Sequence, residues 1–157
     1  MAPIDNSPIP IFHLQRYLGK WYEIARYDHF FERDLERVTA TYTLRADGKI
    51  RVLNCGYRPY HAGFQKKCSI GKARFAKNGH GGHLEVSFFL SFYSDYLILE
   101  LDSDYEWALI GSSSDKYLWI LSRTPQLSPS ILQQILEKAS RRGYDTSKLI
   151  FTRQSKR

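Results

Sequence analysis

The chain is poor in cysteine, with only Cys55 and Cys68 among its 157 residues. Two cysteines are too few for a small domain held together by several disulfides or for a zinc site built from four cysteines. Between them lies the turn-rich segment 58–63, and a hairpin centred on His61 and Ala62 would bring the two cysteines directly opposite each other. A cross-strand disulfide between Cys55 and Cys68 and a pair of free thiols on neighbouring strands are the two alternatives.

Long apolar runs are also missing, since no stretch approaches the length of a membrane-spanning helix. The first residues, Met1 to Asn6, lack the basic region and the hydrophobic core of a signal peptide. A chain of 157 residues has the length of one domain and is large enough to bury a substantial core. We therefore expect a single domain over residues 1–157, in which residues 1–12 form an extended N-terminal arm.

No segment of the chain concentrates the charge. The net charge is +7, from 23 basic and 16 acidic side chains, and its small clusters at 66–67, 141–142 and 156–157 are scattered. Proteins that bind nucleic acids usually gather basic residues in one stripe or arm, so we expect no nucleic-acid partner. The surplus fits either a solvated basic surface or affinity for anionic lipids, and hence peripheral contact with a membrane.

The motifs of the common enzyme classes are absent: there is no Gly-x-Ser-x-Gly, no phosphate loop, no dinucleotide-binding fingerprint and no zinc-protease motif. His80 and His83 flank two glycines in a turn, but a structural metal site normally needs four ligands. No nucleophile, base and orienting acid can be nominated together. The sequence therefore predicts a protein that is not an enzyme and that carries no metal and no cofactor.

Aromatic residues are plentiful, at 15% of the chain, and they favour strands and apolar cavities. From Trp21 to Arg123 the sequence reads as apolar runs separated by short turns. Such a meander loses its exposed edges most simply by closing, so we expect an all-β fold, an antiparallel up-and-down β-barrel over residues 21–123. Its eight strands are the run that begins at Trp21 and the runs 38–44, 49–57, 65–75, 84–89, 96–101, 107–111 and 117–122.

Trp21 enters the first strand directly after the turn residue Gly19, and Arg123 ends the last strand. An indole and a guanidinium at these positions can stack in a cation–π contact that seals one end of the barrel. A sealed barrel of this size is a container, which indicates a binding protein.

One segment departs from the strand pattern, an amphipathic helix expected over residues 128–142. Ser128 is a suitable N-cap, Pro129 suits the first helical position and Gly143 suits the C-terminal cap. One apolar stripe on the helix would pack against the barrel wall, and it consists of Ile131, Leu132, Ile135, Leu136 and Ala139. A short strand over residues 148–152 follows the helix.

The order of these motifs resembles the lipocalin family. Gly19-x-Trp21 matches the first family signature, Ser103-Asp104-Tyr105 resembles the second and Arg123 matches the third. Within the family the sequence is most similar to the branch of bacterial outer-membrane lipocalins and apolipoprotein D-like proteins. The resemblance implies an eight-stranded barrel with a C-terminal helix on its wall. The pair of cysteines departs from the bacterial branch, as does the lack of a lipidated cysteine near the start.

Alternate residues of a barrel strand face inward, which selects the candidate ligand-binding residues. Arg123 fixes the parity of the last strand, so Trp119 and Tyr117 face the interior. The aromatic segment 88–93 would form a lip at which Tyr93 offers its hydroxyl to a polar headgroup. The full set of expected ligand-binding residues is Ala40, Tyr42, Val86, Phe88, Tyr93, Tyr117 and Trp119 in and around the cavity, with Phe30 and Phe31 at the entrance.

Glu23 shares the parity of Trp21, and we expect it either to pair with a basic neighbour or to bind a headgroup. The function expected from the family resemblance is that of a carrier that holds fatty acids, lysophospholipids or phospholipids in the barrel. The alternatives are an enzyme of apolar substrates on the same scaffold and a tetrapyrrole binder, although no histidine falls clearly on an inner strand face. We expect a monomer or a weak homodimer, located at the periplasmic side of the outer membrane if the native precursor carries a lipoprotein signal.

Overall fold

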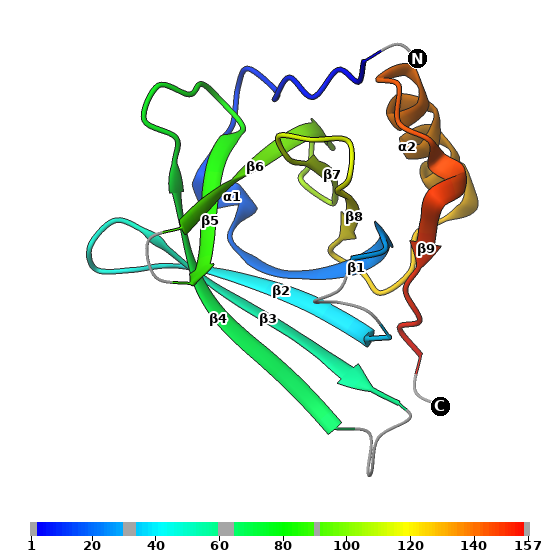
Figure 1. Ribbon diagram of the computed structural model, residues 1–157, viewed down its shortest axis with the longest axis horizontal. Helices are drawn as coiled ribbons and strands as arrows, with labels where there is room; N and C mark the ends of the chain where they lie inside the picture. Colours follow the sequence, from blue (N-terminus) through cyan, green and yellow to red (C-terminus); the bar gives the residue numbers. More distant parts are fainter. Residues whose placement is uncertain (1–2, 30–33, 60–64, 90–91, 156–157) are drawn as a thin grey trace.

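The computed structural model describes residues 3–29, 34–59, 65–89 and 92–155, and a closed antiparallel barrel forms its centre (Figure 1). The strands follow one another around the barrel in sequence order, and β1 pairs with both β8 and β2, which closes the ring. The expected fold class is therefore confirmed. The barrel strands are β1 (Gly19–Tyr27), β2 (Glu36–Leu44), β3 (Ile50–Arg58), β4 (Gln65–Phe75), β5 (His83–Phe89), β6 (Phe92–Leu101), β7 (Trp107–Gly111) and β8 (Leu118–Ser122).

Alternation along the strands divides the buried apolar side chains into two cores. The inner core fills the barrel and includes Trp21, Tyr42, Ile50, Ala73, Leu84, Ile98, Ile110 and Leu121. The outer core lies between the barrel wall and the C-terminal helix and includes Ile24, Leu97, Leu99, Leu109, Leu118, Ile120, Ile135 and Ala139. Strands β6, β7, β8 and β1 contribute to both cores, so this part of the wall is apolar on both faces.

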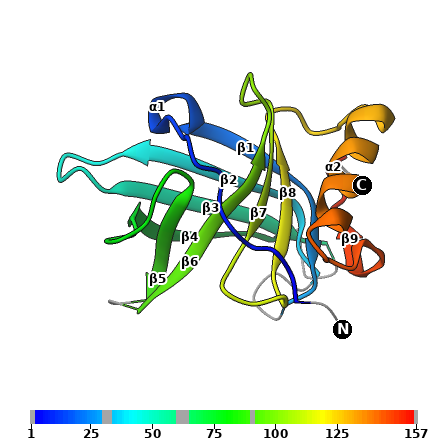
Figure 2. The same ribbon diagram turned by 90° about the horizontal axis from the view of Figure 1, so that it is seen from above.

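Helix α2 (Pro129–Arg141) covers one side of the barrel, next to β1 and β8 (Figures 1 and 2). The Ser128 side chain accepts a hydrogen bond from the backbone N–H of Ile131, and Pro129 occupies the first turn. Ile135 and Ala139 are fully buried against the wall. No helix in the described residues is long and apolar enough to cross a membrane.

Arg123 and Trp21 close one end of the barrel, which we call the closed end. The guanidinium carbon lies 3.8 Å from the centre of the indole ring, and the indole N–H donates to the Tyr17 carbonyl at 2.8 Å. Gly19 has a φ of 105°, a backbone conformation that favours glycine, and a Cβ there would lie 3.3 Å from an Arg123 nitrogen. Tyr17 belongs to α1 (Leu14–Tyr17), a single helical turn that the sequence analysis did not predict.

The C-terminal segment fills the seam between β1 and β2 at the other end, the open end. β1 pairs with β2 only from Gly19 to Tyr22, and beyond that point its partner is β9 (Leu149–Phe151), which pairs with Ala25, Arg26 and Tyr27. The Gln154 amide then bridges the two strands, donating to the carbonyls of Glu23 at 2.7 Å and Val38 at 3.0 Å. The last described residues are therefore part of the barrel wall.

Cys55 and Cys68 form a disulfide across β3 and β4. They are directly opposed in the strand register, on the face opposite to Ile50, Val52 and Ala73 of the inner core, so the disulfide lies outside the barrel. One boundary differs from the expectation: β6 begins at Phe92 rather than Tyr96, so most of the aromatic segment 88–93 belongs to the β5–β6 hairpin and not to a separate lip.

Candidate functional site

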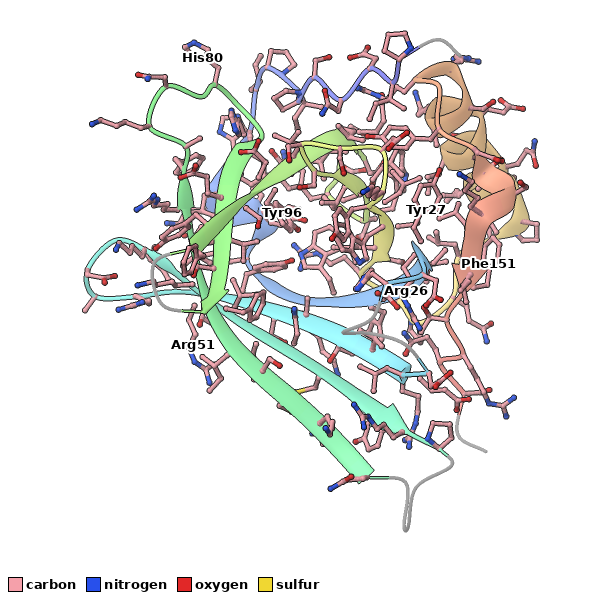
Figure 3. All side chains as sticks on the ribbon, viewed as in Figure 1. Arg26, Tyr27, Arg51, His80, Tyr96 and Phe151 are labelled. Atoms are coloured by element: carbon pink, nitrogen blue, oxygen red, sulfur yellow. A yellow bond between two sulfur atoms is a disulfide. The ribbon has the colours of Figure 1, made fainter. Side chains whose placement is uncertain are left out.

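Three tyrosine hydroxyls meet inside the barrel near the closed end. The Tyr96 oxygen lies 2.5 Å from that of Tyr17 and 2.8 Å from that of Tyr42, so Tyr96 is the central member of the chain. Figure 3 shows Tyr96 pointing into the barrel from β6. Burial raises the pKa of Tyr17 and of Tyr96 well above the usual phenol value, so both are neutral hydrogen-bonding groups at physiological pH.

Apolar side chains surround this tyrosine cluster and leave little room. The hollow holds about 10 Å³, close to the space that one water molecule needs, and its lining residues are Leu14, Tyr17, Tyr42, Ile50, Ala73, Leu84, Val86 and Tyr96. The closed half of the barrel is thus a packed core with a polar centre. The open half of the barrel lies beyond this packed core, and we call it the calyx.

Aromatic rings cover one wall of the calyx. The Tyr117 and Trp119 rings stack at 5.8 Å with an angle of 12° between their planes. His29, which follows β1 and is 6% exposed, lies edge-on to Trp119 at 5.5 Å and 5.8 Å from Tyr117. Trp119 itself is partly buried against the inner core. This wall offers flat apolar surface together with one imidazole.

A buried ion pair adjoins the aromatic wall. Arg26 is opposite Trp119 in the strand register, and its guanidinium donates to the Glu23 carboxylate at 2.8 Å. Both side chains are almost fully buried, and the Thr152 hydroxyl also donates to Glu23 at 2.5 Å. The Thr152 hydroxyl thus adds a hydrogen bond to the buried pair, and such bonds offset part of the cost of burying its charges. Of the two roles considered for Glu23, the structure has it pairing with a basic neighbour.

The opposite wall becomes polar toward the open end. Asn54 of β3 and Ser69 and Lys67 of β4 share the inner parity of Val52 and Ala73. Lys67 is exposed and Asn54 is partly buried. The calyx is therefore apolar toward the closed half and polar at its mouth, an arrangement suited to an amphipathic molecule.

The structure brings together several of the residues that the sequence selected. Tyr42 belongs to the inner core, while Ala40, Val86 and Trp119 are partly buried against it, and Tyr117 stacks on Trp119. The Phe88 ring covers Gly71 so closely that a Cβ on that glycine would lie 2.6 Å from it. Phe88 is 42% exposed, so it lies at the rim of the barrel. Phe30 and Phe31 lie outside the described residues.

Tyr93 lies elsewhere than expected. Its ring packs 3.6 Å under the Arg74 guanidinium, and Arg74 pairs with Glu85 on the outer face of β4 and β5. Because residues alternate along β6, Tyr93 and Tyr96 face opposite sides of the wall. Tyr93 therefore lies on the outer side of the wall, and the contact of its hydroxyl with a polar headgroup stays a prediction.

The sequence analysis missed Tyr17, Tyr96, His29 and Arg26. Tyr17 comes from an unpredicted helical turn, and His29 follows the end of β1, so alternation along the strands selects neither of them. A register shift between Glu23 and Ala25 changes the parity of β1, so alternation counted from Trp21 does not select Arg26. Tyr96 is opposite Leu84 in the register of β5 and β6, so the inward parity of Leu84 could have identified Tyr96 as an inward-facing residue.

Comparisons with known proteins agree with this architecture. The model of the lipocalin-like domain matches residues 12–154. The chain is 44% identical to the outer membrane lipoprotein Blc of Vibrio cholerae over 97% of its length and 88% of that protein. It is 50% identical to Blc of Escherichia coli K12, covering 91% of this chain and 80% of that protein. Mouse apolipoprotein D is 33% identical, covering 92% and 78%.

Solved structures give the same fold at lower sequence identity. Insecticyanin from the tobacco hornworm Manduca sexta superposes with a TM-score of 0.77 at 21% identity, covering 99% of this chain and 87% of that one. At this identity the likeness concerns the fold alone.

Proposed function

Because this chain belongs to the lipocalin family, whose barrels bind small hydrophobic molecules, we propose that it is a carrier that holds a lipid in the calyx. The observation that supports this most directly is the aromatic wall of Trp119, Tyr117 and His29, which lies above a filled closed half. The ligands we propose are fatty acids, lysophospholipids or phospholipids.

The acyl chain is proposed to lie along Trp119, Val86 and Ala40, with its end toward the tyrosine cluster. Each buried methylene contributes about 0.8 kcal/mol, so a long chain binds at micromolar concentration or better after the costs of association. The headgroup lies at the mouth, where Asn54, Ser69 and Lys67 supply polar groups and one positive charge. An anionic headgroup is therefore favoured.

The named bacterial relatives are outer membrane lipoproteins, which bears on where the carrier works. We propose the cell envelope, at the periplasmic side of the outer membrane. The disulfide between Cys55 and Cys68 fits that oxidising compartment.

Native mass spectrometry of the purified protein, never exposed to detergent or organic solvent, tests the carrier function. We expect an adduct of lipid mass that disappears under denaturing conditions, on a monomer or a weak homodimer. Protein that is bare and that also fails to take up added oleate or lysophospholipid would contradict the proposal. The denatured mass also reports whether the two cysteines have lost their hydrogens.

An enzyme on this scaffold is less well supported. Glu23 is bound by Arg26 and Thr152, and Tyr93 packs under Arg74 on the outer face. Neither of the two groups that the sequence nominated for chemistry is thus directed at a substrate in the calyx.

A tetrapyrrole ligand has one observation in its favour, the buried His29 imidazole against Trp119. Titration with haem tests it directly. A Soret band that shifts on binding and is lost in a His29→Ala variant would favour this function over the lipid carrier.

A further inference from the structure

Exposed apolar side chains gather where β4 meets the β5–β6 hairpin. Phe92 is 73% exposed, Ile70 is 63% exposed and Phe88 is 42% exposed. They surround one stretch of the wall from both faces: Phe88 covers Gly71 on the inner face of β4, the neighbouring Ile70 lies on the outer face, and Phe92 is paired to the end of β5 across the hairpin. We call these three residues the apolar tip.

Basic side chains flank the apolar tip on the outer face of the sheet. Arg51 and Lys72 are opposed in the register of β3 and β4, and Lys66 lies on the same face farther along β4. Figure 3 shows Arg51 pointing away from the barrel. We call Arg51, Lys66 and Lys72 the basic flank.

The basic flank is not neutralised by neighbouring carboxylates. On the adjoining outer face, Glu85 pairs with Arg74 at 3.0 Å and Asp95 pairs with His83 at 3.0 Å. Within the described part of the chain, no salt bridge involves a member of the basic flank. This side of the molecule therefore carries uncompensated positive charge around exposed apolar groups.

The closed end carries charge of both signs. Asp47, Asp104 and Glu106 are exposed there, but Arg45 pairs with Asp47 at 2.9 Å, and Arg16 and Lys20 are exposed at the same end. An anionic surface is thus attracted to the β3–β4 side, where the cations of the basic flank have no carboxylate partner among the described residues.

We infer that the apolar tip and the basic flank together dock on an anionic lipid surface, an inference that rests on the proposed carrier function. Phenylalanine at the interface and lysine or arginine toward anionic headgroups are the chemistry by which peripheral proteins bind membranes. A second copy of this chain is a poorer occupant, because each copy has a net charge of +7 and its own cations would face those of its partner.

Docking in this way brings the calyx mouth to the membrane. The tip lies at the open end of β5 and β6, and β4 continues from Ile70 to Gln65 without a β5 partner. An acyl chain then passes between the bilayer and the wall of Trp119 with little exposure to water.

Flotation with vesicles tests the inference. The probes are vesicles of phosphatidylcholine alone and of phosphatidylcholine mixed with phosphatidylglycerol, at ionic strengths of about 0.01 M and 0.15 M, where the Debye length falls from about 30 to 8 Å. The variants are Phe92→Ser for the tip and Arg51→Gln with Lys72→Gln for the flank. The matched controls are Ile11→Ser, an apolar side chain 72% exposed elsewhere, and Arg141→Gln with Lys148→Gln, both exposed near the helix.

We expect binding only to vesicles that contain phosphatidylglycerol, weakened by salt, and reduced about tenfold or more by the flank and tip variants, given about 1 kcal/mol for each basic residue at such a surface. Equal losses in the controls would mean that net charge alone drives binding, and would overturn the assignment. Self-association that Phe92→Ser abolishes, without vesicle binding, would assign the patch to a second copy.

Affinity for oleate in solution, measured without vesicles, separates this inference from the carrier function. Phe92→Ser is expected to retain that affinity and to acquire ligand from vesicles more slowly than the wild type. Loss of oleate binding in the wild type would instead contradict the proposed function itself.

Discussion

The guanidinium of Arg123 lies 3.8 Å from the centre of the Trp21 ring and also donates to backbone carbonyls of Arg16, Lys20 and Tyr105, at 2.8, 3.1 and 3.1 Å. One side chain therefore ties together the segment before β1, β1 itself and the β6–β7 turn. The planar fork of arginine suits this arrangement, because several N–H groups can donate while the face of the group stacks.

Replacing Arg123 by alanine is expected to lower the free energy of unfolding by about 3 kcal/mol, from the lost cation–π contact and the lost charged hydrogen bonds. Arg123→Lys should recover only part of that loss, since an ammonium cannot reproduce the fork. Urea unfolding measures both, with Arg141→Ala on the exposed face of α2 as the control. A lysine variant as stable as the wild type would contradict this account.

Trp119→Glu is expected to weaken lipid binding at least tenfold, a change of about 1.4 kcal/mol, because the carboxylate interrupts the apolar wall. The matched control is Phe151→Glu, which makes the same kind of change at a side chain 53% exposed on β9. Quenching or displacement of a fluorescent fatty acid gives the affinities, and far-ultraviolet circular dichroism verifies the fold. Equal affinity in a folded Trp119→Glu variant would remove Trp119 from the binding site.

The tyrosine cluster predicts a loss of stability in alkali. The unfolded chain releases phenol protons near pH 10, whereas burial raises the pKa of Tyr17 and Tyr96, so the folded chain retains theirs. Stability from this source is complete below pH 10 and falls as the pH rises above it, by up to about 1.4 kcal/mol per pH unit for each residue.

Tyr96→Phe provides the comparison. The substitution is expected to lower the free energy of unfolding by about 1–3 kcal/mol at neutral pH, because the hydroxyls of Tyr17 and Tyr42 lose their common partner. The free energy of unfolding of the variant is expected to fall less steeply in alkali than that of the wild type. Urea midpoints at several pH values measure both effects. Parallel pH profiles for the two proteins would contradict the role given to Tyr96.

Removing the disulfide is expected to lower the free energy of unfolding by about 3 kcal/mol, the chain-entropy estimate for a loop of about 15 residues. The affinity for lipid should change little, because Cys55 and Cys68 lie outside the barrel. The test compares the double variant Cys55→Ser, Cys68→Ser with the wild type, each with and without reductant. If reductant lowered the free energy of unfolding of the double variant, the effect of reductant could not be assigned to the disulfide.

The fold could be predicted from the sequence because its determinants are local. The Ser128 cap and Pro129 start α2 where expected, and the register of β3 and β4 opposes Cys55 to Cys68. The first half of β6 escaped prediction, because the aromatic run 88–93 has no turn signal of its own.

The calyx was predictable only in part. Trp119 follows from strict alternation along β8, but the register shift in β1 brings Arg26 opposite Trp119 against the parity counted from Trp21. Tyr17 meets Tyr96 across 79 residues of sequence, and nothing local to either residue indicates that contact. These contacts arise from tertiary packing, which the sequence pattern along a single strand does not predict.

The contacts at the seam between β1 and β2 determine when the barrel can close during folding. Glu23 and Gln154 are separated by 131 residues, yet the Gln154 amide holds the wall at that point. During synthesis, β1 and β2 leave the ribosome long before the segment that joins their open halves exists. The calyx therefore has to stay laterally open until translation has passed Gln154, and closure of the barrel is a late event dominated by its longest-range contacts.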